Sequence, residues 1–101
     1  MLAHQFDFDG EPIDFWEWCE LFASPERVVA YDVLDDVEVS TVWLGIDYTF
    51  GLDERAPRIY ETMIFGGELD QVGERYPNRV AAQAGHDQWV AAVRECGAVR
   101  Q

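Results

Sequence analysis

The sequence predicts an α+β fold, a two-layer sandwich in which an antiparallel sheet of three to four strands packs against an N-terminal and a C-terminal helix. Helical apolar patterns lie near both ends of the chain, and β-branched runs alternate with turn signals between them. Helices segregated from a run of strands are typical of this class. With 101 residues, 49% of them hydrophobic, residues 1–101 are expected to form a single domain with its own core.

The first helix is predicted between Pro12 and Ala23, because proline suits the first turn of a helix and Ser24-Pro25 favours its end. Helical spacing places the apolar residues Phe15, Trp18, Cys19 and Phe22 on one side, widened by Trp16 and Ala23. The acids Asp14, Glu17 and Glu20 fall on the opposite side. Before this helix, residues 5–9 alternate polar and aromatic as a short strand would, and Asp9-Gly10 indicates a turn.

Two β-branched runs, Arg27 to Leu34 and Val37 to Ile46, are separated by Asp35-Asp36, which predicts a tight hairpin. Pairing Leu34 with Val37 puts one set of residues on a common face: Val28, Ala30, Asp32, Leu34, Val37, Val39, Thr41 and Trp43. The other face is partly apolar, as expected for a sheet covered on one side.

After a loop from Asp47 to Pro57, residues 58–65 predict a third strand that ends at Gly66-Gly67, and residues 72–76 are compatible with a short fourth. Asn78 is a candidate N-cap for a helix from about Arg79 to Cys96, with Gly97 as its terminator. Its apolar stripe includes Trp89, and His86 is interpreted as a residue at the edge of the core. Tryptophans 16 or 18, 43 and 89 are expected to contribute to the core.

The net charge of −13 lies in the N-terminal half of the chain. Residues 1–54 contain fourteen acids and one arginine, whereas residues 55–101 contain six of each. Such a field repels nucleic acid phosphates and attracts basic surfaces, so we expect no direct nucleic acid binding and a protein partner with a basic surface. No apolar run approaches the length of a membrane span, which predicts a soluble intracellular protein.

No catalytic, phosphate-binding or metal-binding motif occurs in the chain, so no catalytic residue, metal or cofactor is predicted. The chain has two cysteines, Cys19 and Cys96, and their spacing leaves open whether they are bridged. The candidate binding residues are carboxylates of the N-terminal half: Asp7, Asp9, Glu11, Asp14, Glu17, Glu20, Asp35, Asp36 and Glu38. Carboxylates spaced on a rigid scaffold can occupy a cationic groove that normally holds phosphates, and they can equally serve solubility alone.

Four segments resemble a family of small acidic proteins encoded by phages that infect actinobacteria: "DFDGEPI", "VSTVWLGIDYTFG", "YETMIFGG" and "RYPNRVAAQAGHDQWV". The resemblance extends from about Phe6 to Val93. It implies a phage origin and a location in the host cytoplasm, and it supplies no catalytic residues.

The leading hypothesis is a non-enzymatic phage accessory protein that binds a host factor or modulates host defence, through the acidic half, as a nucleic acid mimic would, or through exposed aromatic residues. The alternative is a structural or assembly domain that self-associates through the partly apolar sheet face. A small enzyme that uses the acids and His86 is a weaker third hypothesis.

Overall fold

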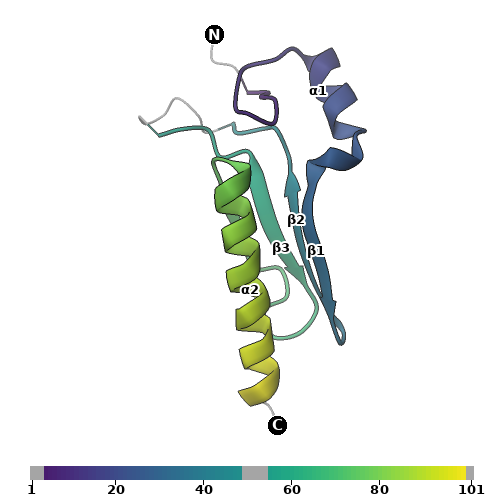
Figure 1. The fold of residues 1–101 in the computed structure, drawn as a ribbon, viewed down its shortest axis with the longest axis vertical. Helices are drawn as coiled ribbons and strands as arrows, with labels where there is room; N and C mark the ends of the chain where they lie inside the picture. Colours follow the sequence, from purple (N-terminus) through teal and green to yellow (C-terminus); the bar gives the residue numbers. More distant parts are fainter. Residues whose placement is uncertain (1–3, 49–54, 100–101) are drawn as a thin grey trace.

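The computed structural model describes residues 4–48 and 55–99 and confirms the predicted α+β fold (Figure 1). Four antiparallel strands form a sheet in the order β1-β2-β3-β4, and α2 packs along one face of it. The elements are α1 (Phe15–Phe22), a short 3-10 turn (Pro25–Arg27), β1 (Val28–Leu34), β2 (Val37–Trp43), β3 (Tyr60–Phe65), β4 (Gly73–Tyr76) and α2 (Arg79–Val99). The molecule is elongated, about 52 Å long and 20 Å across its shortest direction, with α1 beyond one end of the sheet.

Both helices differ from their predicted bounds. The first begins at Phe15 rather than Pro12, because Asp14 is its N-cap and accepts a hydrogen bond from the Glu17 backbone N–H at 2.9 Å. The second continues through Gly97 to Val99, so the prediction that Gly97 terminates it was wrong. A glycine weakens a helix but ends it only where the backbone turns left-handed, and Gly97 has no positive φ.

The β1–β2 hairpin has the predicted register, with Leu34 opposite Val37 and the two aspartates in the turn. Asp35 takes a positive φ of 54°, which aspartate tolerates better than most residues. A register shift between Val28 and Ala30 then places Val28 opposite Val42 instead of Trp43. The predicted common face is therefore correct from Ala30 onward but wrong for Val28, because the irregularity inserts an extra residue into the edge strand.

The central strand carries the largest buried side chain. Trp43, at the end of β2, is fully buried against Phe6, Ile59 and Tyr60, while a second cluster of Val39, Ile64, Val90 and Val93 lies along α2. The predicted strand over residues 5–9 is reduced to two isolated bridges, which still hold Phe6 in the core. Residues 37–43 thus form β2, one of the two interior strands of the sheet, with Val39, Thr41 and Trp43 buried.

The sheet face away from α2 carries no helix in the described part of the chain (Figure 1). Cross-strand rows on this face contain Tyr31, Ser40 and Met63, and beside them Val33, Glu38 and Phe65. Tyr31, Val33 and Phe65 are exposed. We refer to Tyr31, Val33, Met63 and Phe65 as the open sheet face, and its mixed character matches the prediction.

Candidate functional site

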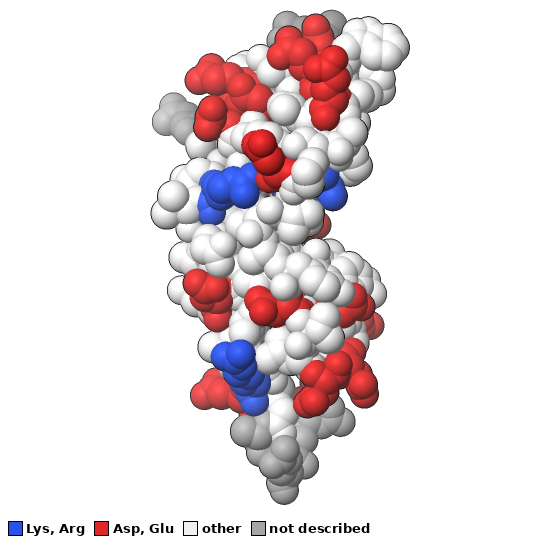
Figure 2. Space-filling view, turned by 45° about the vertical axis from the view of Figure 1, so that its right-hand side comes forward, with Lys and Arg blue, Asp and Glu red and all other residues white. Residues whose placement is uncertain are grey.

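The structure does not bring the nine candidate acids together on one surface. Six of them, from Asp7 to Glu20, belong to the N-terminal segment and α1 at one end of the molecule. Asp35 and Asp36 form the β1–β2 turn at the other end, and Glu38 lies in β2 beside the open sheet face, where it accepts a hydrogen bond from the Tyr31 hydroxyl. Figure 2 shows acidic side chains near the upper end of the visible face and again in its lower half. Two separate acidic surfaces result.

Two of the N-terminal carboxylates stabilise the backbone. Asp7 accepts hydrogen bonds from the backbone N–H groups of Asp9 and Glu11, both at 2.9 Å, and so closes the turn before α1. Asp14 caps α1. Because these two side chains already accept hydrogen bonds, the acids at this end that are better suited to a partner are Asp9, Glu11, Glu17 and Glu20, all exposed.

Large aromatic side chains are exposed on α1, the helix that also carries Glu17 and Glu20. Trp16 is 76% exposed and Phe15 is 55% exposed, and their rings meet edge to face with centroids 5.7 Å apart. This corrects the predicted burial of the apolar side of the helix, since no residue of α1 is buried. The helix packs beyond the end of the sheet, where no second layer covers its aromatic residues in the described part of the chain.

α1 is nevertheless held in place. The half-buried Trp18 donates from its indole N–H to the Leu44 carbonyl at 2.9 Å, and Phe22 lies beside Trp43. The Arg27 guanidinium lies over the Phe22 ring, 4.1 Å from the ring centre. We define the α1 surface as Phe15, Trp16, Asp9, Glu17 and Glu20. Asp9, Glu17 and Glu20 also line a groove of about 280 Å³ whose apolar lining is Phe8 and Leu21.

A chain of hydrogen bonds crosses the layer between α2 and the sheet. It begins at Asp32, whose side chain is 54% exposed, and is buried from His86 to Tyr76. Sequence reasoning missed it. His86 is 1% exposed, and its Nε2 lies 2.7 Å from Asp32 Oδ2 while its Nδ1 lies 2.7 Å from Thr41 Oγ1. The chain continues from Thr41 to the Thr62 hydroxyl and from there to Tyr76. The signals available in the sequence were Asp32 and Thr41 on the predicted common face of the hairpin and His86 at the edge of the core.

The order hydroxyl, imidazole, carboxylate matches that of a nucleophilic triad. Thr41, however, is completely buried, so a substrate has no access to its oxygen. The arrangement instead provides buried polar groups with partners, which is the usual requirement for polar residues in a core. At the end of the chain, burial raises the pKa of Tyr76 above its ordinary value.

The buried Asp47 side chain also has hydrogen-bond partners within the fold. The buried Asp47 carboxylate accepts hydrogen bonds from the Arg55 guanidinium at 2.6 Å and from the Arg58 backbone N–H at 2.8 Å. Among residues 4–48 and 55–99, no group of three or more His, Cys, Asp and Glu side chains is placed to share a metal ion. Cys19 and Cys96 are both free thiols.

Comparisons with protein-family models, curated proteins and solved structures found no match to this chain. Within the described residues, neither helix is long and apolar enough to cross a bilayer.

Proposed function

We propose that this protein acts by binding another protein and that the α1 surface is its contact site for a basic partner. The observation that carries the proposal is the exposure of Trp16 and Phe15 on the same short helix as the exposed acids Glu17 and Glu20. Tryptophan is enriched among the residues that dominate binding energy, and large exposed apolar side chains on a small protein mark interaction surfaces. The acids around them favour a partner that presents arginine or lysine.

The net charge of −13 supports the same class of partner through long-range attraction. An acidic surface raises the association rate with a basic one and repels nucleic acids. Mimicry of nucleic acid is one form that this binding can take, in which Asp9, Glu17 and Glu20 occupy positions that phosphates hold in the partner's groove. From the resemblance of the sequence, we place this activity in an accessory protein of an actinobacterial phage, acting in the host cytoplasm without a catalytic step of its own.

The test begins with affinity capture from an actinobacterial host lysate and measures association kinetics with the purified partner. Trp16→Ala should weaken binding by about 2 kcal/mol or more, as expected for a central aromatic contact. Glu17→Gln with Glu20→Gln should slow association and reduce its salt dependence. Asp14 is left unchanged because it caps the helix.

Matched controls come from exposed positions on α2, namely Val80→Ala and the pair Asp87→Asn with Glu95→Gln. These variants should bind as the natural protein does. Competition by duplex DNA for the same partner would indicate mimicry. A partner whose kinetics are indifferent to the α1 variants and to salt would contradict the proposal.

The alternative function, self-association, is favoured by the open sheet face. Tyr31, Val33 and Phe65 present exposed apolar surface on a sheet that lacks a second covering layer in the described part of the chain. Sedimentation equilibrium at several concentrations tests it. A mass that rises with concentration in the natural protein and stays monomeric in Val33→Glu would establish the open sheet face as a self-association surface.

A further inference from the structure

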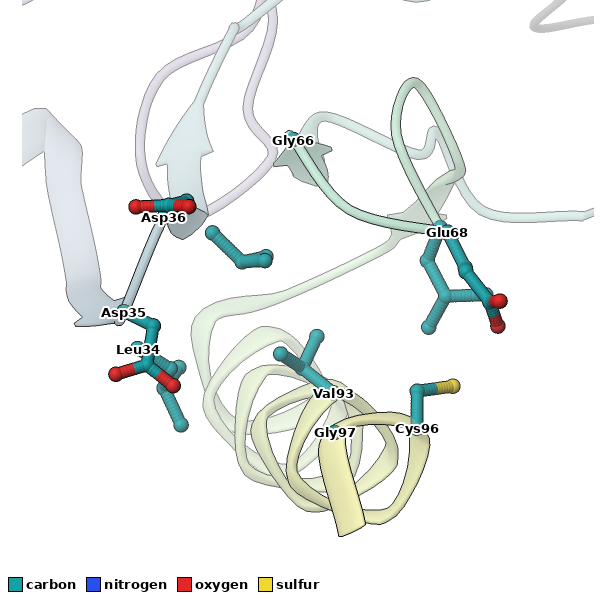
Figure 3. A pocket seen from close by; sticks show the side chains of 10 residues that line it. Leu34, Asp35, Asp36, Gly66, Glu68, Val93, Cys96 and Gly97 are labelled. Carbon is teal, nitrogen blue, oxygen red and sulfur yellow. The ribbon is translucent and has the colours of Figure 1, made fainter. Parts of the chain in front are cut away.

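A second pocket lies at the end of the molecule opposite α1 (Figure 3). The β1–β2 turn, the segment after β3 and the last turns of α2 enclose a pocket of about 190 Å³. Its apolar lining is Leu34, Val37, Leu69 and Val93. Val93 belongs to the second core cluster, and the other three residues pack against that cluster. The pocket is therefore an extension of the core that remains open to solvent.

The rim of this hairpin pocket is acidic. Figure 3 shows Asp35 and Asp36 on one side and Glu68 on the other, with Val93 and Cys96 of α2 between them. Asp35 and Asp36 are exposed residues of the β1–β2 turn. A ligand seated here thus meets apolar side chains inside and negative charge at the mouth.

The wall of the pocket is held in a fixed position. Gly66, with a φ of 95°, passes so close to the turn that an added Cβ would lie 2.5 Å from the Asp36 carbonyl oxygen. The Gly66 backbone N–H donates to Asp70 Oδ1 at 2.7 Å, which closes the following turn. A site whose walls are already in place loses less entropy when it binds.

We propose that the hairpin pocket binds a short basic segment of a partner protein, which inserts one aliphatic side chain while its flanking arginine or lysine side chains contact Asp35 and Asp36. This contact is independent of the α1 surface, from which it is separated by the length of the sheet.

The volume of the pocket and the charge at its rim both favour a basic segment with one aliphatic side chain over a small-molecule ligand. Small-molecule sites in proteins usually measure about 300–1,000 Å³, whereas a pocket of about 190 Å³ suits a single large side chain. A cationic group packed against Leu34 and Val93 would lose its hydration, which is costly. Asp35 and Asp36 are exposed and can contact a cation that stays in water. The charged groups of the ligand therefore belong at the rim and its apolar group inside.

Amide chemical shifts of the isotope-labelled protein, titrated with synthetic pentapeptides, test the proposal. Gly-Arg-Leu-Arg-Gly should change the amide chemical shifts of Leu34, Leu69 and Val93. Gly-Arg-Ser-Arg-Gly should bind about tenfold or more weakly, because it lacks the apolar anchor. Gly-Glu-Leu-Glu-Gly should bind more weakly still, because its charge is repelled by the rim.

Two variants locate the site. Gly97 lines the pocket, and a Cβ added there meets nothing within 4 Å, so Gly97→Leu should narrow the mouth without disturbing the fold. Gly97→Leu should weaken the binding of Gly-Arg-Leu-Arg-Gly about tenfold or more. Ala84→Leu, at an exposed position of the same helix, should leave this binding unchanged. Asp35→Asn with Asp36→Asn should remove the preference for arginine over glutamate peptides.

The double variant Asp9→Asn with Glu20→Gln changes the α1 surface, at the opposite end of the molecule. It should leave peptide binding unchanged, which distinguishes binding at the hairpin pocket from binding at the α1 surface. The proposal is overturned if no peptide shifts the pocket residues at millimolar concentration, if the shifts lie on α1, or if Gly97→Leu has no effect. Failure of the α1 variants to alter partner binding would not bear on these peptide titrations.

Discussion

The Nδ1 atom of His86 lies 2.7 Å from the hydroxyl oxygen of Thr41, which joins the middle of α2 to the interior strand β2. On its other side, the ring faces the Asp32 carboxylate, which accepts a hydrogen bond from Nε2–H. On the sheet side, Thr41 is also hydrogen-bonded to Thr62, and Thr62 accepts a hydrogen bond from the Tyr76 hydroxyl. These contacts connect β1 to β4 beneath the helix.

His86→Ala should destabilise the protein by roughly 2–4 kcal/mol, because it leaves a cavity and removes a partner of a buried hydroxyl. Urea unfolding measures the change. Gln83→Ala, at an exposed position one turn earlier on α2, should change stability by less than about 0.5 kcal/mol. Equal midpoints for His86→Ala and the natural protein would show that the helix does not depend on this contact.

The two buried threonines should be energetically coupled. Thr41→Val and Thr62→Val should each cost about 1–3 kcal/mol, since each leaves neighbouring polar atoms without a partner. Either single substitution already removes the hydrogen bond between the two threonines. The cost of the double variant should therefore fall short of the sum of the two single costs by about 0.5 kcal/mol or more. A double-mutant cycle in urea tests this, and strict additivity would contradict the coupling.

Two glycines of α2 should respond in opposite ways to alanine. At Gly85 a Cβ would lie 2.2 Å from the Tyr76 ring, so Gly85→Ala should lower the melting temperature despite the higher helix propensity of alanine. At Gly97 nothing lies within 4 Å, and Gly97→Ala should stabilise by up to about 1 kcal/mol. Stabilisation by both substitutions would mean that Tyr76 moves aside at no cost.

Stability should fall at alkaline pH. Burial raises the pKa of Tyr76, and it also raises the pKa of Tyr60. A raised pKa in the folded state stabilises the protein below the unfolded value of ~10, and this contribution is lost as pH rises through the folded value. Tyr76→Phe should therefore show a shallower loss of stability above pH ~10 than the natural protein. The same variant measured at neutral pH provides the reference for its lost hydrogen bond.

The tryptophans should differ in their contribution to stability. Trp43→Ala should cost about 3–5 kcal/mol because the side chain is fully buried. Trp89→Ala should cost less, since its half-buried ring loses less apolar contact, although it also loses a hydrogen bond to Glu74. Equal urea midpoints for the two variants would contradict this order.

Local sequence chemistry was sufficient to predict the order and type of the main elements. Asp35-Asp36 between β-branched runs predicted the hairpin and its register, and Gly66-Gly67 marked the end of β3. Pro77-Asn78 located the start of α2. These features depend on neighbours in the chain, and turn residues and side-chain periodicity encode them directly. The sequence also determined the acidic charge of the N-terminal half.

Tertiary structure decided which of these residues are exposed, paired or enclosed. Helical periodicity identified an apolar side on α1, but only its position beyond the end of the sheet leaves Trp16 in solvent. The fold separated the acids between two ends, joined Asp32 to His86 across 54 positions, and enclosed the hairpin pocket. Each outcome depends on contacts between distant segments. Local patterns do not encode these contacts, because packing selects among several faces of comparable apolar character.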